Sequence, residues 1–174
     1  LATSTAWADE WDALFTRAIA AKERALDNND PATWQEALDL FQQADRVRAT
    51  KEVKYELAGA AARLKQDDVA VEAYEAALSL GLDGAAKDKA RAFVDEKAPM
   101  LARLTVTGPA GAAVSVNGRA RGKLPLSRPL VVFAGERSVR ARLEDDSAER
   151  TVNVAAGKSV HVELSSEISI SQCV

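Results

Sequence analysis

The side chains that most often carry out chemistry are scarce in this chain of 174 residues. His161 is the one histidine and Cys173 the one cysteine. A zinc site takes several such ligands, and a catalytic triad or Cys–His pair needs a nucleophile and a base held together. His161 alternates with Val160 and Val162, so we expect it to face solvent. The sequence therefore predicts no catalytic residues, no metal site and no cofactor, and we expect the chain not to be an enzyme.

Three short runs of acidic or amide residues are the other candidates for a metal site, at 28–30, 67–68 and 145–146. None has the alternating ligand spacing of a calcium-binding loop, and each stands where a helix cap or a turn is expected. The glycines of 108–122 are followed by neither a Lys-Ser/Thr step nor a helix start, so they do not form a phosphate-binding loop. We interpret all of these residues as structural.

Arginines form the arrangement best suited to binding. Arg140 and Arg142 are expected on the outward face of one strand, and Arg119 and Arg121 alternate along another. If those strands are neighbours, the four guanidinium groups form an anion patch for carboxylates or phosphates. The alternative is an ordinary solvated strand face. No aromatic residues are interleaved with the arginines, so we expect no nucleic-acid binding.

The first hundred residues are rich in alanine, and their apolar side chains recur every three or four residues. This spacing predicts five helices packed as hairpins. Asp30 and Thr50 are the expected N-caps of the second and third helices, with Pro31 at the first helical position. The fourth helix is expected to stop at Gly81, and the fifth to cover residues 85–97.

From Leu104 onward the apolar pattern changes to period two, which is typical of half-buried strands. Asn117-Gly118 predicts a two-residue hairpin, because both positions tolerate a positive φ. Several short strands at this spacing predict a small β-sandwich or partial barrel. The predicted fold class is therefore α+β in two domains, helical hairpins followed by an all-β sandwich. The residues expected to point inward are Leu104, Val106, Val114, Val116, Val139, Ala141, Leu143, Val152, Val154, Val160, Val162 and Leu164.

The helical part contains an internal repeat of a small, an aromatic and a small residue. The two copies stand 33 residues apart, Ala37, Phe41, Ala44 and Ala70, Tyr74, Ala77. This part resembles a tetratricopeptide repeat, most clearly over residues 53–82; a generic helical bundle is the alternative. The resemblance implies a partner groove lined by the first helix of each hairpin, with Glu52, Tyr55 and Arg63 as candidate residues. Tyr55 and Arg63 suit packing or solubility equally well.

Residues 102–166 resemble a PEGA domain, a small bacterial β module named after a Pro-Glu-Gly-Ala motif. The acidic residue of that motif is replaced here by alanine. The resemblance implies a small β-sandwich associated with a bacterial surface or envelope protein. The matching residues are Pro109-Ala110-Gly111-Ala112, Val114, Val116, Asn117-Gly118, Gly122 and Pro125-Leu126.

The two halves of the chain carry opposite net charge. Residues 1–101 hold 13 Lys and Arg against 19 Asp and Glu, whereas residues 102–166 hold 10 against 6. Each half is either simply solvated, or the β half meets something anionic, the helical half included.

The start of the chain, LATSTAWA, ends in a small-x-small step that is typical of a secretory cleavage site. We therefore expect export to the periplasm or envelope of a bacterium, with a fortuitous match as the alternative. Residues 1–8 would be a leader remnant or disordered, 9–99 the helical domain, 102–166 the β domain and 167–174 a tail. No apolar run approaches the roughly 18 residues of a membrane span.

These observations together predict a non-enzymatic interaction or scaffolding module. The helical domain is expected to bind a protein partner, and the β domain to anchor or orient it in the envelope. The alternative is that the β domain binds an anionic cell-wall or surface polysaccharide.

Overall fold

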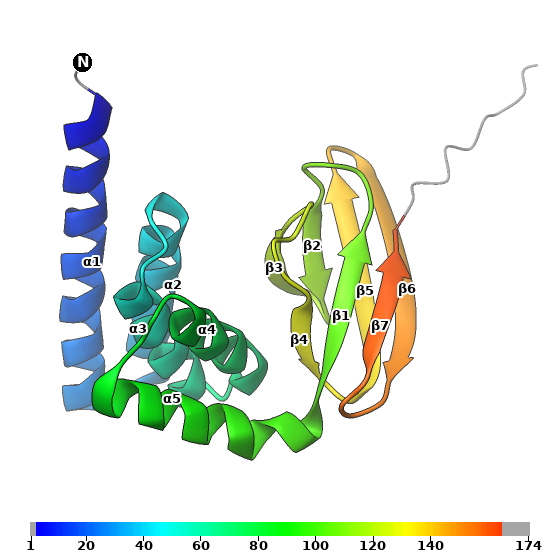
Figure 1. Ribbon diagram of the computed structural model, residues 1–174. Helices are drawn as coiled ribbons and strands as arrows, with labels where there is room; N and C mark the ends of the chain where they lie inside the picture. Colours follow the sequence, from blue (N-terminus) through cyan, green and yellow to red (C-terminus); the bar gives the residue numbers. More distant parts are fainter. Residues whose placement is uncertain (1–2, 165–174) are drawn as a thin grey trace, which may run out of the picture. The chain divides into compact units, whose positions relative to one another are not determined.

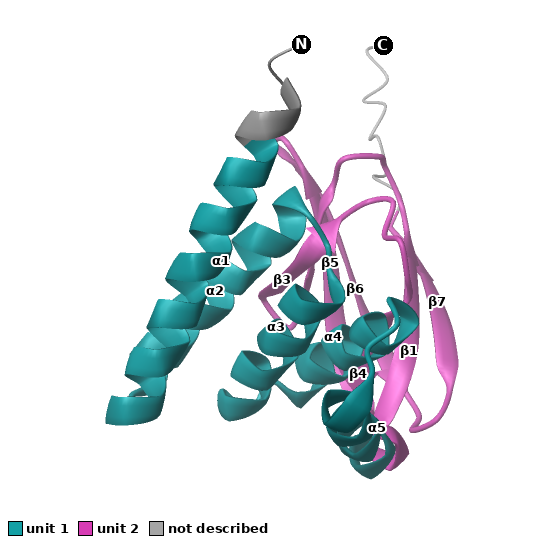
Figure 2. Ribbon diagram, turned by 60° about the vertical axis from the view of Figure 1, so that its left-hand side comes forward, with its two compact units in different colours: residues 1–97 teal, residues 98–174 magenta. Residues whose placement is uncertain are grey.

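The computed structural model describes residues 3–164, with side chains from Trp7 onward. The chain divides into two compact units, residues 1–97 and 98–174 (Figure 2). The first unit is helical, and the second is made of strands after one short 3-10 helix, Ala98–Met100. The predicted α+β arrangement of a helical region followed by a β region is therefore confirmed. The boundary between the two units lies between residues 97 and 98, whereas we predicted a helical domain at 9–99 and a β domain at 102–166. The predicted tail, residues 167–174, lies outside the described residues.

The helical unit is built from two helical hairpins and a fifth helix (Figure 1). α1 packs against α2 and α3 against α4; α2–α3 contacts join these two pairs, and α4–α5 contacts attach the fifth helix to the second pair. α1 begins inside the segment 1–8 that the sequence set apart. The helices are α1 (Thr3–Asn28), α2 (Pro31–Val47), α3 (Lys51–Arg63), α4 (Asp67–Ser79) and α5 (Gly84–Lys97).

Small and aromatic residues have different roles in the packing of these helices. The four alanines of the repeat are fully buried, and such small side chains let helix backbones approach closely. The ring of Phe41 lies 6.1 Å from that of Phe15, and Tyr74 lies 5.7 Å from Tyr55 and 5.3 Å from Phe93. The repeat therefore places its aromatic side chain in each case against neighbouring helices.

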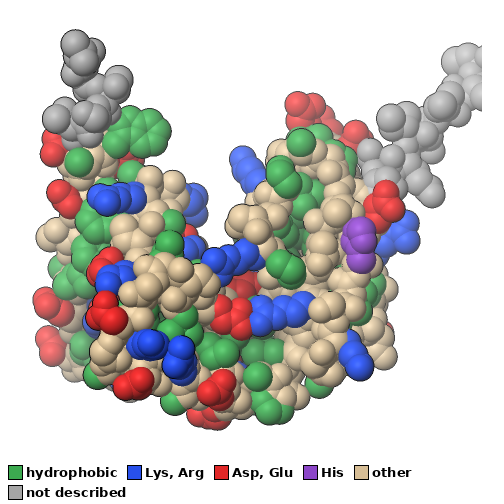
Figure 3. Space-filling view, viewed as in Figure 1, with side chains coloured by type: hydrophobic (Ala, Val, Ile, Leu, Met, Phe, Trp, Pro, Cys, Tyr) green, Lys and Arg blue, Asp and Glu red, His purple; other side chains and the backbone are tan. Residues whose placement is uncertain are grey.

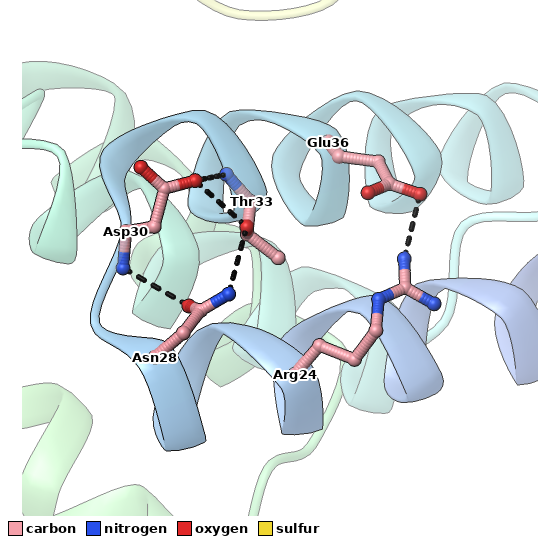
Figure 4. Close-up of polar contacts among 5 residues, drawn as sticks. All are labelled: Arg24, Asn28, Asp30, Thr33 and Glu36. Atoms are coloured by element: carbon pink, nitrogen blue, oxygen red, sulfur yellow. Dashed lines mark hydrogen bonds and ion pairs between the residues drawn. The ribbon is translucent and has the colours of Figure 1, made fainter.

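The turn between α1 and α2 is held by side-chain hydrogen bonds (Figure 4). The Asp30 carboxylate accepts from the Thr33 backbone N–H at 3.0 Å and from its hydroxyl at 2.8 Å, and the Asn28 side chain accepts from the Asp30 N–H. The hydrogen bond from the Thr33 hydroxyl is the main reason that the pKa of Asp30 is lowered. Arg24 pairs with Glu36 across the hairpin at 2.8 Å. The run 28–30 is thus a helix cap, as we interpreted it.

The β unit consists of two sheets (Figure 1). In the three-stranded sheet, ordered β4-β1-β7, β1 is antiparallel to β4 and parallel to β7. The four-stranded sheet, ordered β3-β2-β5-β6, is antiparallel throughout. Apolar side chains from both sheets form one core. The strands are β1 (Leu101–Thr107), β2 (Ala113–Val116), β3 (Arg119–Lys123), β4 (Leu130–Phe133), β5 (Gly135–Leu143), β6 (Asp146–Val154) and β7 (Ser159–Glu163).

Most of the predicted strand pattern agrees with this structure. Asn117 and Gly118, with φ of 48° and 78°, form the predicted two-residue hairpin between β2 and β3. β4 did not figure in the period-two pattern, because three successive residues, 130–132, are buried and no alternation marks them. The prediction for Leu143 was wrong: its side chain is 37% exposed at the end of β5.

Gly108 permits the close approach of two segments. A Cβ at this position would lie closer than 3.0 Å to the carbonyl oxygen of Leu164. The residue before Gly108 also contacts this segment, because the Leu164 N–H donates to the Thr107 carbonyl at 2.8 Å. Because the clash is with backbone, a side chain here displaces the end of the three-stranded sheet.

The substitution Gly108→Ala is therefore expected to destabilise the β unit by about 1 to 3 kcal/mol, the usual range for overpacking. The measurement is hydrogen exchange of the Leu164 amide, which should become faster. Ala110→Ser, at an exposed position of the same loop, is the control and should leave the exchange rate unchanged. Equal exchange in Gly108→Ala and wild type would contradict the close approach.

Candidate functional site

The three candidate groove residues lie on one side of α3 but in different surroundings. Glu52 is exposed in the first turn of the helix. The Tyr55 ring packs against Tyr74, and the Arg63 guanidinium lies 5.5 Å from the Trp34 ring centroid. Tyr55 and Arg63 therefore contact neighbouring helices with part of their surface, whereas Glu52 presents its carboxylate to solvent.

Helices α1 and α5 flank this side of α3. Lys22 of α1 forms a 2.7 Å ion pair with Glu56, and the ammonium group of Lys89 in α5 lies 5.9 Å from the Tyr55 ring centroid. Between these contacts, a Cβ added at Gly59 would meet no heavy atom within 4 Å. Acidic and basic side chains are interspersed over the helices in Figure 3. We call Glu52, Tyr55, Glu56, Gly59 and Arg63 the α3 face; it combines mixed charge with open space at its centre.

The four arginines of the predicted anion patch do not share one surface. Arg140 and Arg142 are exposed on the outward face of β5, opposite Ser115 and Ala113 of β2. β2 separates β5 from β3, so the two arginine-bearing strands are not neighbours. Arg119 lies opposite Val116, whose side chain belongs to the core. Because facing residues of an antiparallel pair lie on the same side of the sheet, Arg119 is on the inward side, away from Arg140 and Arg142.

Arg121 has a structural contact instead. The β2–β3 register shifts between Val114 and Ser115, where β3 has one extra residue, and this bulge leaves Arg121 outside the regular pairing. From there the guanidinium of Arg121 donates to the Val131 carbonyl at 2.9 Å. Val131 belongs to β4 in the other sheet, so this hydrogen bond joins the two sheets.

Arg137 makes a second connection of this kind, which the sequence analysis missed. Its guanidinium donates to the backbone carbonyls of Phe133, Ala134 and Glu136 at 2.9 to 3.0 Å. Ala134 donates its own N–H to Met100 next to β1, so the alternating ladder directs the carbonyls of residues 131 and 133 away from β1. Arg121 and Arg137 therefore cap the outward edge of β4. The one signal in the sequence was an arginine beside the turn at 134–136.

On the outward face of the four-stranded sheet, Arg140 has an anionic partner. Its Nε donates to Glu149 of β6 at 2.9 Å, and the Ser138 hydroxyl donates to the other carboxylate oxygen. The hydrogen bond from Ser138, followed by the contacts with Arg140, lowers the pKa of Glu149. The charge of Arg140 is therefore largely compensated. The other cations described on this face are Lys123 and Arg142, placed on either side of Ala113, and the Nε of Arg142 donates to the Glu144 carbonyl at 3.2 Å.

The other residues considered as catalytic or metal-binding candidates, His161 and the acidic run at 67–68, make hydrogen bonds or ion pairs with neighbouring side chains. His161 is exposed on β7, and its Nε2 shares a 2.8 Å hydrogen bond with the Thr107 hydroxyl. Asp67 pairs with Lys97 at 3.2 Å in the first turn of α4. Within residues 3–164, no group of three or more His, Cys, Asp or Glu is arranged to hold a metal ion.

Replacing Arg137 by lysine is expected to lower the free energy of unfolding of the β unit by about 2 kcal/mol, since hydrogen bonds to charged groups contribute roughly 1.5 to 3 kcal/mol and an ammonium group lacks the planar fork of donors. Chemical denaturation followed by amide NMR signals of β1 and β4 measures the change. Arg150→Lys, an exposed arginine of β6, should shift the midpoint little. Equal midpoints for the two variants would contradict the capping role.

None of the described helices has the length and apolar character required to cross a membrane. No family model, no curated protein and no solved structure matches this chain.

Proposed function

We propose that this protein is a non-enzymatic interaction module of the bacterial cell envelope. Its helical unit, a tetratricopeptide-like array, binds a protein partner, and its β unit, a PEGA-like sandwich, anchors or orients that partner. Export to the periplasm or envelope belongs to the same proposal, and it is supported by the AWA step at residues 6–8 and by the resemblance of residues 102–166 to envelope-associated domains.

The observation that carries the proposal is the open space at the centre of the α3 face. Helix α3 presents Gly59 with nothing within 4 Å of its Cβ position, although glycine costs a helix interior about 1 kcal/mol relative to alanine. Packing within the unit does not require the glycine there. A partner backbone or side chain that approaches α3 closely does explain it. The surrounding Glu52, Tyr55 and Arg63 supply charge and an aromatic surface, which are common in protein interfaces.

The test compares two substitutions at this glycine. Gly59→Arg fills the open space and should reduce binding of a protein partner by at least about tenfold, which corresponds to 1.4 kcal/mol. Gly59→Ala adds a single methyl group and is the matched control. The measurement is affinity capture from a bacterial envelope extract, followed by a titration of the purified partner. The proposal fails if Gly59→Arg retains the same partner with unchanged affinity.

Binding of an anionic polysaccharide by the β unit is the second candidate function. Lys123 and Arg142 support it, because they stand about 10 Å apart across β2, two strand spacings, on the outward face of the four-stranded sheet. An extended anionic polymer suits such a row better than a small ligand does. Glu149 opposes this function, since it compensates Arg140.

Co-sedimentation with isolated cell-wall sacculi tests this second candidate. Pelleting should weaken with salt, because exposed charges are screened over about 10 Å at 0.1 M. It should weaken further in the double variant Lys123→Ala/Arg142→Ala and strengthen in Glu149→Gln, which releases Arg140. Lys158→Ala removes an exposed charge from a different loop and is the control. Pelleting that ignores salt, or that Lys158→Ala weakens equally, would count against the outward face.

A further inference from the structure

The longest free strand edge described in the β unit belongs to β6. Among the described residues, β6 pairs with β5 alone, and Leu143 stands opposite Asp146 across a two-residue loop. In such a hairpin this closing pair is hydrogen bonded, and the ladder then alternates. Four residues consequently direct both N–H and C=O away from the sheet: Ser147, Glu149, Thr151 and Asn153.

The other edges offer less to a pairing segment. Arg121 and Arg137 donate to the outward carbonyls of β4, so that edge is capped. β3 has five residues and carries a bulge, and β7 has five residues. Natural proteins use such short, bulged or covered edges to prevent strand addition. Within the described residues β6 is long, regular and uncovered, and its one protection is the charge of Arg150 on the inward side, opposite Val139. An acidic residue on an added strand neutralises that charge.

A partly open, mainly apolar cavity of about 90 Å³ lies beside the first residues of β6, and Asp146 and Ser147 also line it. Its walls include Leu143 and Ala148 of the β5–β6 hairpin, Pro109 and Leu164. Cavities of roughly 150 Å³ accommodate benzene, so this one suits a single branched aliphatic side chain. Leu143, which we predicted to be buried, lines this cavity at the end of β5.

Charge along β6 sets the chemistry of an occupant. Glu144, Asp145 and Asp146 are exposed at the tip of the hairpin, next to the cavity. Arg150 is exposed further along the strand, on the side that bears Ala148. A complementary strand therefore has basic residues at the tip, an aliphatic residue beside Ala148 and an acidic residue beside Arg150, since opposite charges in facing positions are favourable.

We propose that the β6 edge binds an extended peptide segment of another protein, which adds an antiparallel fifth strand and inserts one aliphatic side chain into the cavity. Strand addition of this kind takes affinity from backbone hydrogen bonds and specificity from pockets for alternate side chains. The site involves residues other than the α3 face, so either proposal can fail without the other.

Charge argues against the two occupants that this chain could itself supply. Residues 165–174 contain one acidic and no basic side chain, which does not complement the acidic tip. A second copy paired antiparallel along the whole of β6 brings Arg150 opposite Arg150, because residue 150 is the midpoint of the strand. Like charges in facing positions destabilise a strand pair.

The test uses an unlabelled heptapeptide, TETVTKK, whose sequence is chosen to complement the charges along β6 and to place one aliphatic side chain at the cavity. Paired antiparallel from Thr151 to Asp145, it places its valine beside Ala148 and its lysines at the acidic tip. Amide hydrogen exchange of the full chain is measured by NMR with and without millimolar peptide. Free protein should show protected amides at residues 148, 150 and 152, which bond to β5, and fast exchange at Ser147, Glu149 and Thr151.

Addition of the peptide should slow exchange at these three outward amides by about tenfold or more. Asn153 lies beyond the end of the peptide and should stay fast, which makes it an internal control. A peptide N-methylated at its third and fifth residues lacks the donors that face β6 and should protect none of them. Thr151→Pro should weaken peptide binding, whereas Ala120→Pro, at the outward edge of β3, should leave it unchanged.

Three results would overturn the proposal. The first is fast exchange at the outward amides in the presence of the peptide. The second is protection that exists without peptide and disappears when residues 165–174 are deleted, which would identify the chain's own end as the occupant. The third is protection that rises with protein concentration alone, which would identify a second copy.

Discussion

The backbone carbonyls on the outward edge of β4 impose the constraint on which the β unit depends. Val131 is fully buried, and a buried carbonyl without a donor is costly. The donors come from guanidinium groups of the opposite sheet, Arg121 on β3 and Arg137 on β5. The same hydrogen bonds that satisfy the edge therefore also hold the two sheets in register around the core of Leu104, Val114 and Val139.

This use of arginine decides which surfaces are available for ligands. A guanidinium group bound to backbone carbonyls, or one paired with a carboxylate as in Arg140–Glu149, offers few donors to a polymer or a phosphate. Basic residues therefore overstate the anion-binding capacity of the β half when they are counted from the sequence. Two features of the described residues that internal contacts leave unexplained are the glycine at the centre of the α3 face and the free edge of β6 beside its cavity.

The sequence predicted what depends on neighbours along the chain. The Asp30 and Thr50 caps, the Asn117-Gly118 hairpin and the change from helical to strand periodicity involve local geometry, and each agrees with the structure. The arrangement of the arginines depends instead on the order of strands in a sheet and on a bulge in the β2–β3 pairing, and neither leaves a periodic signal. The β6 edge was missed for the same reason, since a free edge is defined by the absence of a neighbouring strand.

The parallel pairing of β1 with β7 has a consequence for the order in which the chain folds. Each helix contacts the next one along the sequence, so the helical unit has all of its elements once Lys97 has been synthesised. β1 follows immediately, but Arg103 lies opposite Ser159, and such distant pairings form slowly because a long loop must close. Since synthesis runs from the N-terminus, every newly made chain passes through a stage in which the helices are complete while β1 still lacks one of its two neighbours.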